Sequence, residues 1–219
     1  MGHGNRRFGP APIGYRPSRW RTELRIEWPD NFCPWNYVPP DLDDRLRDVV
    51  DSAKDERPIQ EFLQEHPGTL GFIAAGGYGR WVWSRPRFGA EFVPDFLVSM
   101  RCSDGYRWFL IELESPRASP TTKSGRQSAK LTQAKSQIAD WRIWLRKNIG
   151  YVHRELGFTH LDAECQAVVI IGRRRERSET DRERYRALSE ERLTIMSYDR
   201  LIDMVFTWEL MAERLFEKL

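Results

Sequence analysis

Hydrophobic and polar residues follow two different periods along the chain, and each period predicts a different kind of element. Apolar residues three and four apart predict helices over residues 41–53, 58–66, 127–148 and 199–219. Short apolar runs between turn residues predict strands over residues 71–75, 81–84, 92–100, 106–114, 166–172 and 193–196. A highly charged stretch over residues 179–191 predicts one more helix.

The order of these elements predicts the fold class. Strands come first, followed by an alternation of helix and strand, which is typical of an α/β or α+β fold with a mixed central β-sheet flanked by helices. Residues 1–40 are rich in Pro, Arg and Trp and show no period. We expect them to form an irregular N-terminal arm, either a partly ordered tail or a segment that contacts DNA or another copy, and residues 41–219 to form the domain.

Carboxylates interrupt two of the predicted strands. Asp95 lies in the apolar run 93–98, and Glu112 and Glu114 lie in the run 108–116. Alternate residues of a strand share a face, so Glu112 and Glu114 point the same way. Burying an ionised carboxylate costs several kcal/mol without compensation. Three such groups from two strands therefore predict a site for a hard divalent cation such as Mg²⁺.

Composition narrows the class of protein. The chain has 219 residues, 40% of them hydrophobic, and a net charge of +3. Its three widely spaced cysteines form no disulfide framework and no zinc motif, which favours a reducing, cytoplasmic setting. No apolar run of about 18 residues is present, so no membrane span is expected.

Basic residues are concentrated on either side of the predicted long helix's start. Eight Lys or Arg side chains lie between residues 117 and 147, against the single acid Asp140. Such a cluster is either a solvated surface or a binding surface for a polyanion. The candidates for DNA contact are Lys123, Arg126, Lys130 and Lys135.

Several segments, in order, resemble a known group of proteins. Pro94-Asp95 followed by Glu112-Leu113-Glu114 resembles the motif of the PD-(D/E)xK nuclease superfamily. More narrowly, the chain resembles the Shedu (DUF4263) family of bacterial antiphage nucleases from about residue 56 to residue 205. The other matching segments are Glu56 with residues 60–63, His66-Pro67, the helix 133–141, Ile171-Gly172-Arg173 and residues 197–201.

The resemblance implies a metal-dependent DNA endonuclease that uses Mg²⁺ or Mn²⁺ and acts in antiphage defence. It implies that Asp95 and Glu112 ligate the metal, and that Glu56 completes the acidic shell. Gln133 or Gln137 matches the glutamine of the helix that follows, which would hold a phosphate oxygen or a water. The family resemblance also suggests a dimer or tetramer.

One position departs from the motif: Glu114 stands where the motif has lysine. A carboxylate there can act as a general base or as a further ligand, so activity is not excluded. Lys130 or Lys135 is a candidate replacement for the missing cation.

Simpler interpretations of the same residues stay open. Asp95 could cap a turn after Pro94, and the two glutamates could pair with Arg107 or Arg117. The whole domain could be a catalytically inactive relative that binds DNA or protein as a sensor or scaffold. A third possibility is a structural subunit whose N-terminal arm builds an oligomer.

Overall fold

The computed structural model describes residues 28–33, 39, 41–74, 76, 79–174, 183 and 185–216, and side chains as far as residue 211. The chain divides into two compact units, Met1–Asp30 and Asn31–Leu219. A 3-10 helix, η2, covers Pro29–Asn31, and everything else below belongs to the second unit. The predicted arm falls almost entirely outside the described residues, although Phe32 and Cys33 form a strand of the sheet.

The described residues form one six-stranded sheet whose strands follow one another in chain order. Its strands are β1 (Phe32–Cys33), β2 (Arg80–Ser84), β3 (Phe96–Cys102), β4 (Gly105–Leu113), β5 (Gln166–Ile170) and β6 (Leu193–Met196). Strands β1 to β4 pair antiparallel, and β5 and β6 join parallel to β4. The sheet is therefore mixed, as the pattern of elements predicted.

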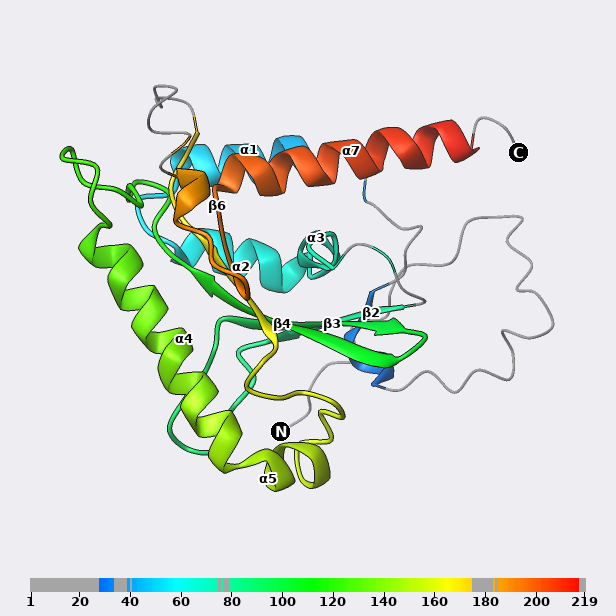
Figure 1. The fold of residues 1–219 in the computed structure, drawn as a ribbon. Coiled ribbons are helices and arrows are strands. Elements are labelled where there is room, and N and C mark those ends of the chain that lie inside the picture. Colours follow the sequence, from blue (N-terminus) through cyan, green and yellow to red (C-terminus); the bar gives the residue numbers. More distant parts are fainter. Residues whose placement is uncertain are drawn as a thin grey trace, which may run out of the picture. The chain divides into compact units, whose positions relative to one another are not determined.

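Helices cover both faces of the sheet (Figure 1). They are α1 (Leu42–Ser52), α2 (Arg57–Glu65), α3 (Gly68–Gly71), α4 (Ala129–Lys147), α5 (Ile149–Arg154) and α7 (Tyr198–Phe216). Helices α1, α2, α3 and α7 lie together on one face, and α4 and α5 lie on the other. This arrangement agrees with an α/β fold that has a PD-(D/E)xK-like core.

The main apolar core fills the space between the sheet and the helices α1, α2 and α7. Leu46, Leu63 and Leu201 come from the three helices, and Ile111 and Ile170 come from the sheet; all five are fully buried. On the opposite face, Leu131, Ala134 and Ile138 recur along α4 at helical spacing and are buried. The residues that face α4 in strand β4 alternate with those that face the main core.

Strand register decides which residues meet at the end of the sheet. Phe96, the first residue of β3, pairs with Ile111 near the end of β4. Asp95 therefore lies just before β3, beside the end of β4 where Glu112 and Glu114 follow. The Glu114 N–H donates to the carbonyl of Ile170, so the chain still runs along β5 at this point.

The structure corrects three details of the predicted elements. Residues 71–74 form no strand, since α3 ends at Gly71 and turns follow it; the apolar run there was too short for its period to separate strand from helix. The two-residue strand β1 and the short helices α3 and α5 were not predicted. Within the predicted helix 179–191, residues 183 and 185–187 are helical and residues 188–191 are not, while the remaining positions lie outside the described residues.

Candidate functional site

Asp95 is held by hydrogen bonds on both of its carboxylate oxygens. The side-chain amide Nε2 of Gln60, on α2, donates to Oδ1 at 2.6 Å. The backbone N–H of Leu113, at the end of β4, donates to Oδ2 at 2.8 Å. Asp95 therefore joins the helix α2 to the ends of two strands, and its orientation is set from both sides.

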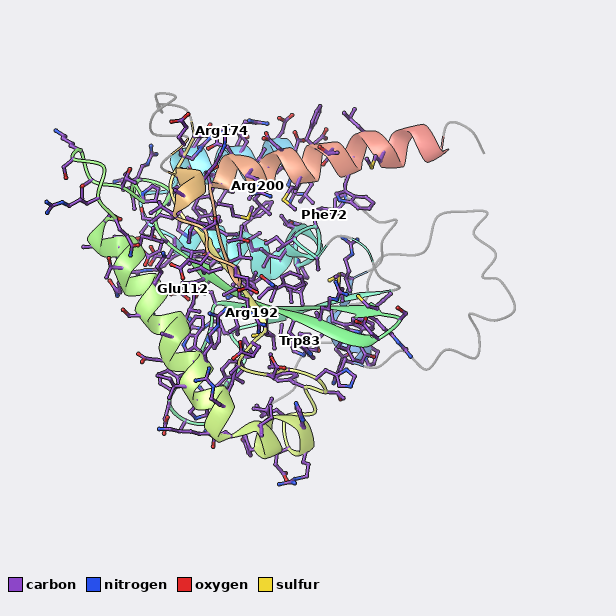
Figure 2. The ribbon with its side chains drawn as sticks, in the orientation of Figure 1. Phe72, Trp83, Glu112, Arg174, Arg192 and Arg200 are labelled. Carbon is purple, nitrogen blue, oxygen red and sulfur yellow. The ribbon has the colours of Figure 1, made fainter. Side chains whose placement is uncertain are left out.

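Glu112 and Glu114 follow Asp95 into the same region, and both are buried. Their exposed fractions are 7% and 5%, while Leu113 between them packs into the main core. This alternation confirms the prediction that the two glutamates share one side of the chain. Glu112 lies where α4 passes the end of the sheet (Figure 2).

The acidic groups interact strongly with one another. Burial, together with the charges of Asp95, Glu114 and Glu56, raises the pKa of Glu112 to about 9. Burial also raises the pKa of Asp95 and of Glu114, with Glu56 adding to both shifts. The four carboxylates thus form one electrostatic cluster, which we call the acidic cluster: Glu56, Asp95, Glu112 and Glu114.

Glu56 reaches the acidic cluster because of the turn between α1 and α2. It precedes Arg57, the first residue of α2, and Gln60 follows one turn later on the same side of the helix. Pro58 at the start of α2 fixes the direction in which the helix begins. Helix α2 therefore contributes both a carboxylate and the donor to Asp95.

Of the two lysines considered as the missing cation, Lys130 lies at the acidic cluster. Its Nζ is 3.5 Å from Oε2 of Glu114. The Ser128 side chain caps α4 by accepting the Leu131 N–H, which places Lys130 in the first turn. Lys135 instead contacts Glu190 at 2.7 Å and the carbonyl of Leu188. We therefore keep Lys130 alone as the candidate.

The remaining predicted residues lie along α4 and the loop before it. Gln133 is exposed and Gln137 is half-buried, and neither forms a hydrogen bond with the acidic cluster among the described residues. Lys123 and Arg126 are exposed in the loop that precedes α4. The roles of these four residues stay predictions.

Two residues at the site were not predicted. Gln60 lay within a matching segment, but nothing in its spacing indicated a contact with Asp95, 35 positions away. Tyr198, fully buried at the start of α7, donates from its hydroxyl to the Glu114 carbonyl at 2.8 Å. Burial raises the pKa of Tyr198, and all four carboxylates of the acidic cluster act on it in the same direction.

The two arginines that were candidate partners of Glu112 and Glu114 pair with other residues. Arg107 pairs with Asp104 at 3.6 Å. Arg117 donates to the carbonyls of Asp51 and Ala53 at the end of α1. Neither arginine therefore neutralises Glu112 or Glu114.

The donor set of the acidic cluster suits a hard divalent cation, since carboxylate oxygens are the ligands that Mg²⁺ and Mn²⁺ take. The charges of Asp95, Glu114 and Glu56 all contribute to the raised pKa of Glu112, and only Lys130 forms an ion pair with any of the four carboxylates among the described residues. As the side chains lie, no group of three His, Cys, Asp or Glu in the described part of the chain is arranged to hold a metal ion. The carboxylates of the acidic cluster are suitable ligands for a divalent cation, but in the described part of the chain no three of them are already positioned to bind one.

The mixed sheet, the helices on both faces and the carboxylates at the ends of β3 and β4 define an α/β protein with a PD-(D/E)xK-like core. Residues 53–202 match the family model described as Shedu protein SduA, C-terminal. The chain belongs to this family. A comparison with curated proteins finds no match.

Family membership suggests a nuclease-like role in antiphage defence. The matched range begins just before Glu56 and ends within α7, so it includes the whole acidic cluster. No helix in the described ranges is both long and apolar enough to cross a membrane.

Proposed function

We propose that the chain is a metal-dependent DNA endonuclease that hydrolyses phosphodiester bonds in antiphage defence. One observation carries the proposal: four carboxylates share one site, two of them buried, with a single lysine beside them. Such a concentration of like charge destabilises the metal-free fold, and arrangements of this kind are found mainly at functional sites. The family to which the chain belongs supports the choice of nuclease chemistry.

Asp95 and Glu112, with Glu56, would hold Mg²⁺ or Mn²⁺. A divalent ion bound there polarises the scissile phosphate, lowers the pKa of a bound water and offsets charge on the leaving oxygen. The chain's own contribution is orientation. Gln60 and the Leu113 N–H each fix one oxygen of Asp95, and the buried strand β4 fixes the backbone of Glu112.

Lys130 supplies the cation that the motif places at position 114. Its ammonium group lies beside the Glu114 carboxylate, so the pair can hold the attacking water and take part in its deprotonation. Lys130 is more than half exposed, which leaves the group accessible to a phosphate. Gln133 and Gln137 follow on the same helix as candidates for contact with that phosphate or water.

DNA is the proposed substrate and partner. Lys123 and Arg126, exposed in the loop before α4, would contact its phosphates without reading sequence. Lys135 was included among these contacts, but its bond to Glu190 reduces its availability. A dimer or tetramer and a cytoplasmic location stay predictions.

The test is cleavage of plasmid and linear DNA, including substrates with nicks and flaps, in Mg²⁺ and in Mn²⁺. We expect metal-dependent cutting that Asp95→Ala and Glu112→Ala each reduce at least about a hundredfold. The exposed acid Asp140, on α4 and outside the acidic cluster, provides the matched control Asp140→Asn. A protein that binds DNA and never cuts any of these substrates would overturn the proposal.

The second candidate is a binding protein that keeps the fold without the chemistry. Two observations favour it: Glu114 occupies the lysine position, and no three ligands are preformed within the described residues. This candidate predicts DNA binding that needs no metal and that survives Glu112→Ala. Cutting that depends on Glu112 excludes it.

A further inference from the structure

Arg85 lies directly beside Asp95 of the acidic cluster. Strand β2 ends at Ser84, which pairs with Phe96, so Arg85 comes next opposite Asp95. The Arg85 backbone N–H donates to the Asp95 carbonyl at 2.8 Å. Directly opposed residues in an antiparallel pair lie close together, so these two positions are neighbours.

The backbone of Arg85 is in the left-handed region, with φ 50°. This conformation costs a residue with a Cβ about 1 kcal/mol or more, and glycine and asparagine adopt it more readily. Arginine is therefore not the residue that the local backbone favours.

The Arg85 side chain is exposed and takes part in no hydrogen bond or ion pair with the part of the chain that the structure describes. Its charge nevertheless reaches the acidic cluster, since Arg85 opposes the rise that burial imposes on the pKa of Asp95. Lys130 acts in the same way on Glu114 from helix α4. Arg85 thus acts on Asp95, and Lys130 acts on Glu114.

A phosphate backbone that approaches four carboxylates is repelled unless cations lie along its path. A guanidinium presents paired donors that match phosphate oxygens, and it stays charged at every working pH. We propose that Arg85 binds a phosphate of the nucleic-acid strand on the Asp95 side of the acidic cluster. The proposal rests on the function proposed above, and it makes Arg85 a substrate-binding residue.

The opposing explanation is that Arg85 serves only to offset the charge of Asp95. Substitutions at Arg85 separate the two. Arg85→Gln removes the charge and keeps the strain, Arg85→Lys keeps the charge, and Arg85→Gly removes both the charge and the strain. Arg85→Gly is expected to be at least as stable as the wild type, which separates binding from folding.

The experiment measures the affinity of each purified variant for a fluorescent 30-base-pair duplex by anisotropy. Measurements are made between 50 and 200 mM salt, once in EDTA and once in Ca²⁺. We expect Arg85→Gln and Arg85→Gly to bind about five- to tenfold more weakly, with a salt slope shallower by about one. Arg85→Lys should keep the slope. The control is Arg107→Gln, which removes an exposed arginine near the far end of β4 and should change neither quantity.

Each outcome decides a separate question. Equal affinity and equal slope in the wild type and Arg85→Gln overturn the role of Arg85 and leave the nuclease proposal intact. DNA binding that depends on Arg85, in a protein that never cuts, supports the contact and overturns the nuclease proposal. A wild-type chain that binds no DNA under either condition overturns both.

Discussion

The Nζ of Lys130 lies 3.5 Å from Oε2 of Glu114, so a lysine from helix α4 meets the residue that replaces the lysine of the strand motif. The two residues come from different elements and meet at the end of the sheet. A positive charge from α4 therefore lies beside Glu114, the position at which the motif itself has a lysine. This relationship gives the most specific set of mutational tests.

The first prediction concerns Lys130. Lys130→Gln should reduce DNA cutting at least about tenfold, because no other lysine contacts the acidic cluster among the described residues. Lys135→Gln should have a small effect, since Lys135 is occupied by Glu190. Initial rates of plasmid nicking in Mn²⁺ measure both. Equal losses in the two variants would contradict the assignment.

The second prediction restores the usual motif. Glu114→Lys should preserve or raise cutting, and the double variant Glu114→Lys with Lys130→Gln should recover most of the rate lost in Lys130→Gln alone. The measurement is the same nicking assay, with melting temperatures to establish that each variant is folded. Complete loss in Glu114→Lys would mean that the Glu114 carboxylate binds the metal.

The third prediction concerns Gln60. Gln60→Ala removes the donor to Asp95 Oδ1, and hydrogen bonds to charged groups contribute about 1.5–3 kcal/mol. We expect the Mn²⁺ affinity and the cutting rate each to fall about tenfold. Gln64→Ala changes an exposed glutamine one turn further along the same helix and serves as the control. If both variants behave like the wild type, Gln60 does not orient Asp95.

The fourth prediction is a pH dependence of stability in EDTA. The folded pKa of Glu112 is raised to about 9, above its unfolded value, so its stabilising contribution is fully present below about pH 4 and is lost as the pH rises toward 9. Glu112→Gln should therefore be more stable than the wild type at pH 8 by at least about 1 kcal/mol. Urea unfolding at pH 5 and pH 8 measures the difference, which should be larger at pH 8. A variant less stable than the wild type at pH 8 would contradict this.

The fifth prediction concerns Asp199, which lies outside the acidic cluster. Its pKa is lowered, so the pH dependence of stability has the opposite sign to that of Glu112. Burial alone would raise the pKa of Asp199, but hydrogen bonds from Arg173 and from the Arg174 N–H lower it below its usual value. Arg173 also contacts Asp51, so it joins the end of α1 to the start of α7. Asp199→Asn should reduce stability at neutral pH by about 1–3 kcal/mol. The loss should shrink as the pH falls below about 4, as acid unfolding will show; a pH-independent loss would argue against an ionic origin.

The carboxylates at the ends of β3 and β4 could be predicted because each interrupts an apolar run of the sequence, and because strand alternation places Glu112 and Glu114 on one side. The choice between Lys130 and Lys135 could not be made in the same way. The two lie five residues apart, about 140° around the helix, so the rotation of α4 against the sheet decides which one meets Glu114. That rotation is set by the packing of the whole helix face.

Contacts between distant segments of the chain also could not be predicted from the pattern of hydrophobic and polar residues. In the sequence, Gln60 is an ordinary residue of a predicted helix, and Tyr198 directly precedes another. Only the folded chain brings Gln60 to Asp95 and Tyr198 to the Glu114 carbonyl. The strand expected over residues 71–75 was wrong for a local reason, since a short apolar run after a helix carries no clear period.

The most direct test of the central claim is a calorimetric titration of the wild-type chain and of Asp95→Asn, Glu112→Gln and Asp140→Asn with Mn²⁺. The account predicts a divalent site in the wild type and in Asp140→Asn that weakens at least about tenfold in the other two. Absence of Mn²⁺ binding in the wild type, or equal affinity in all four proteins, would contradict it.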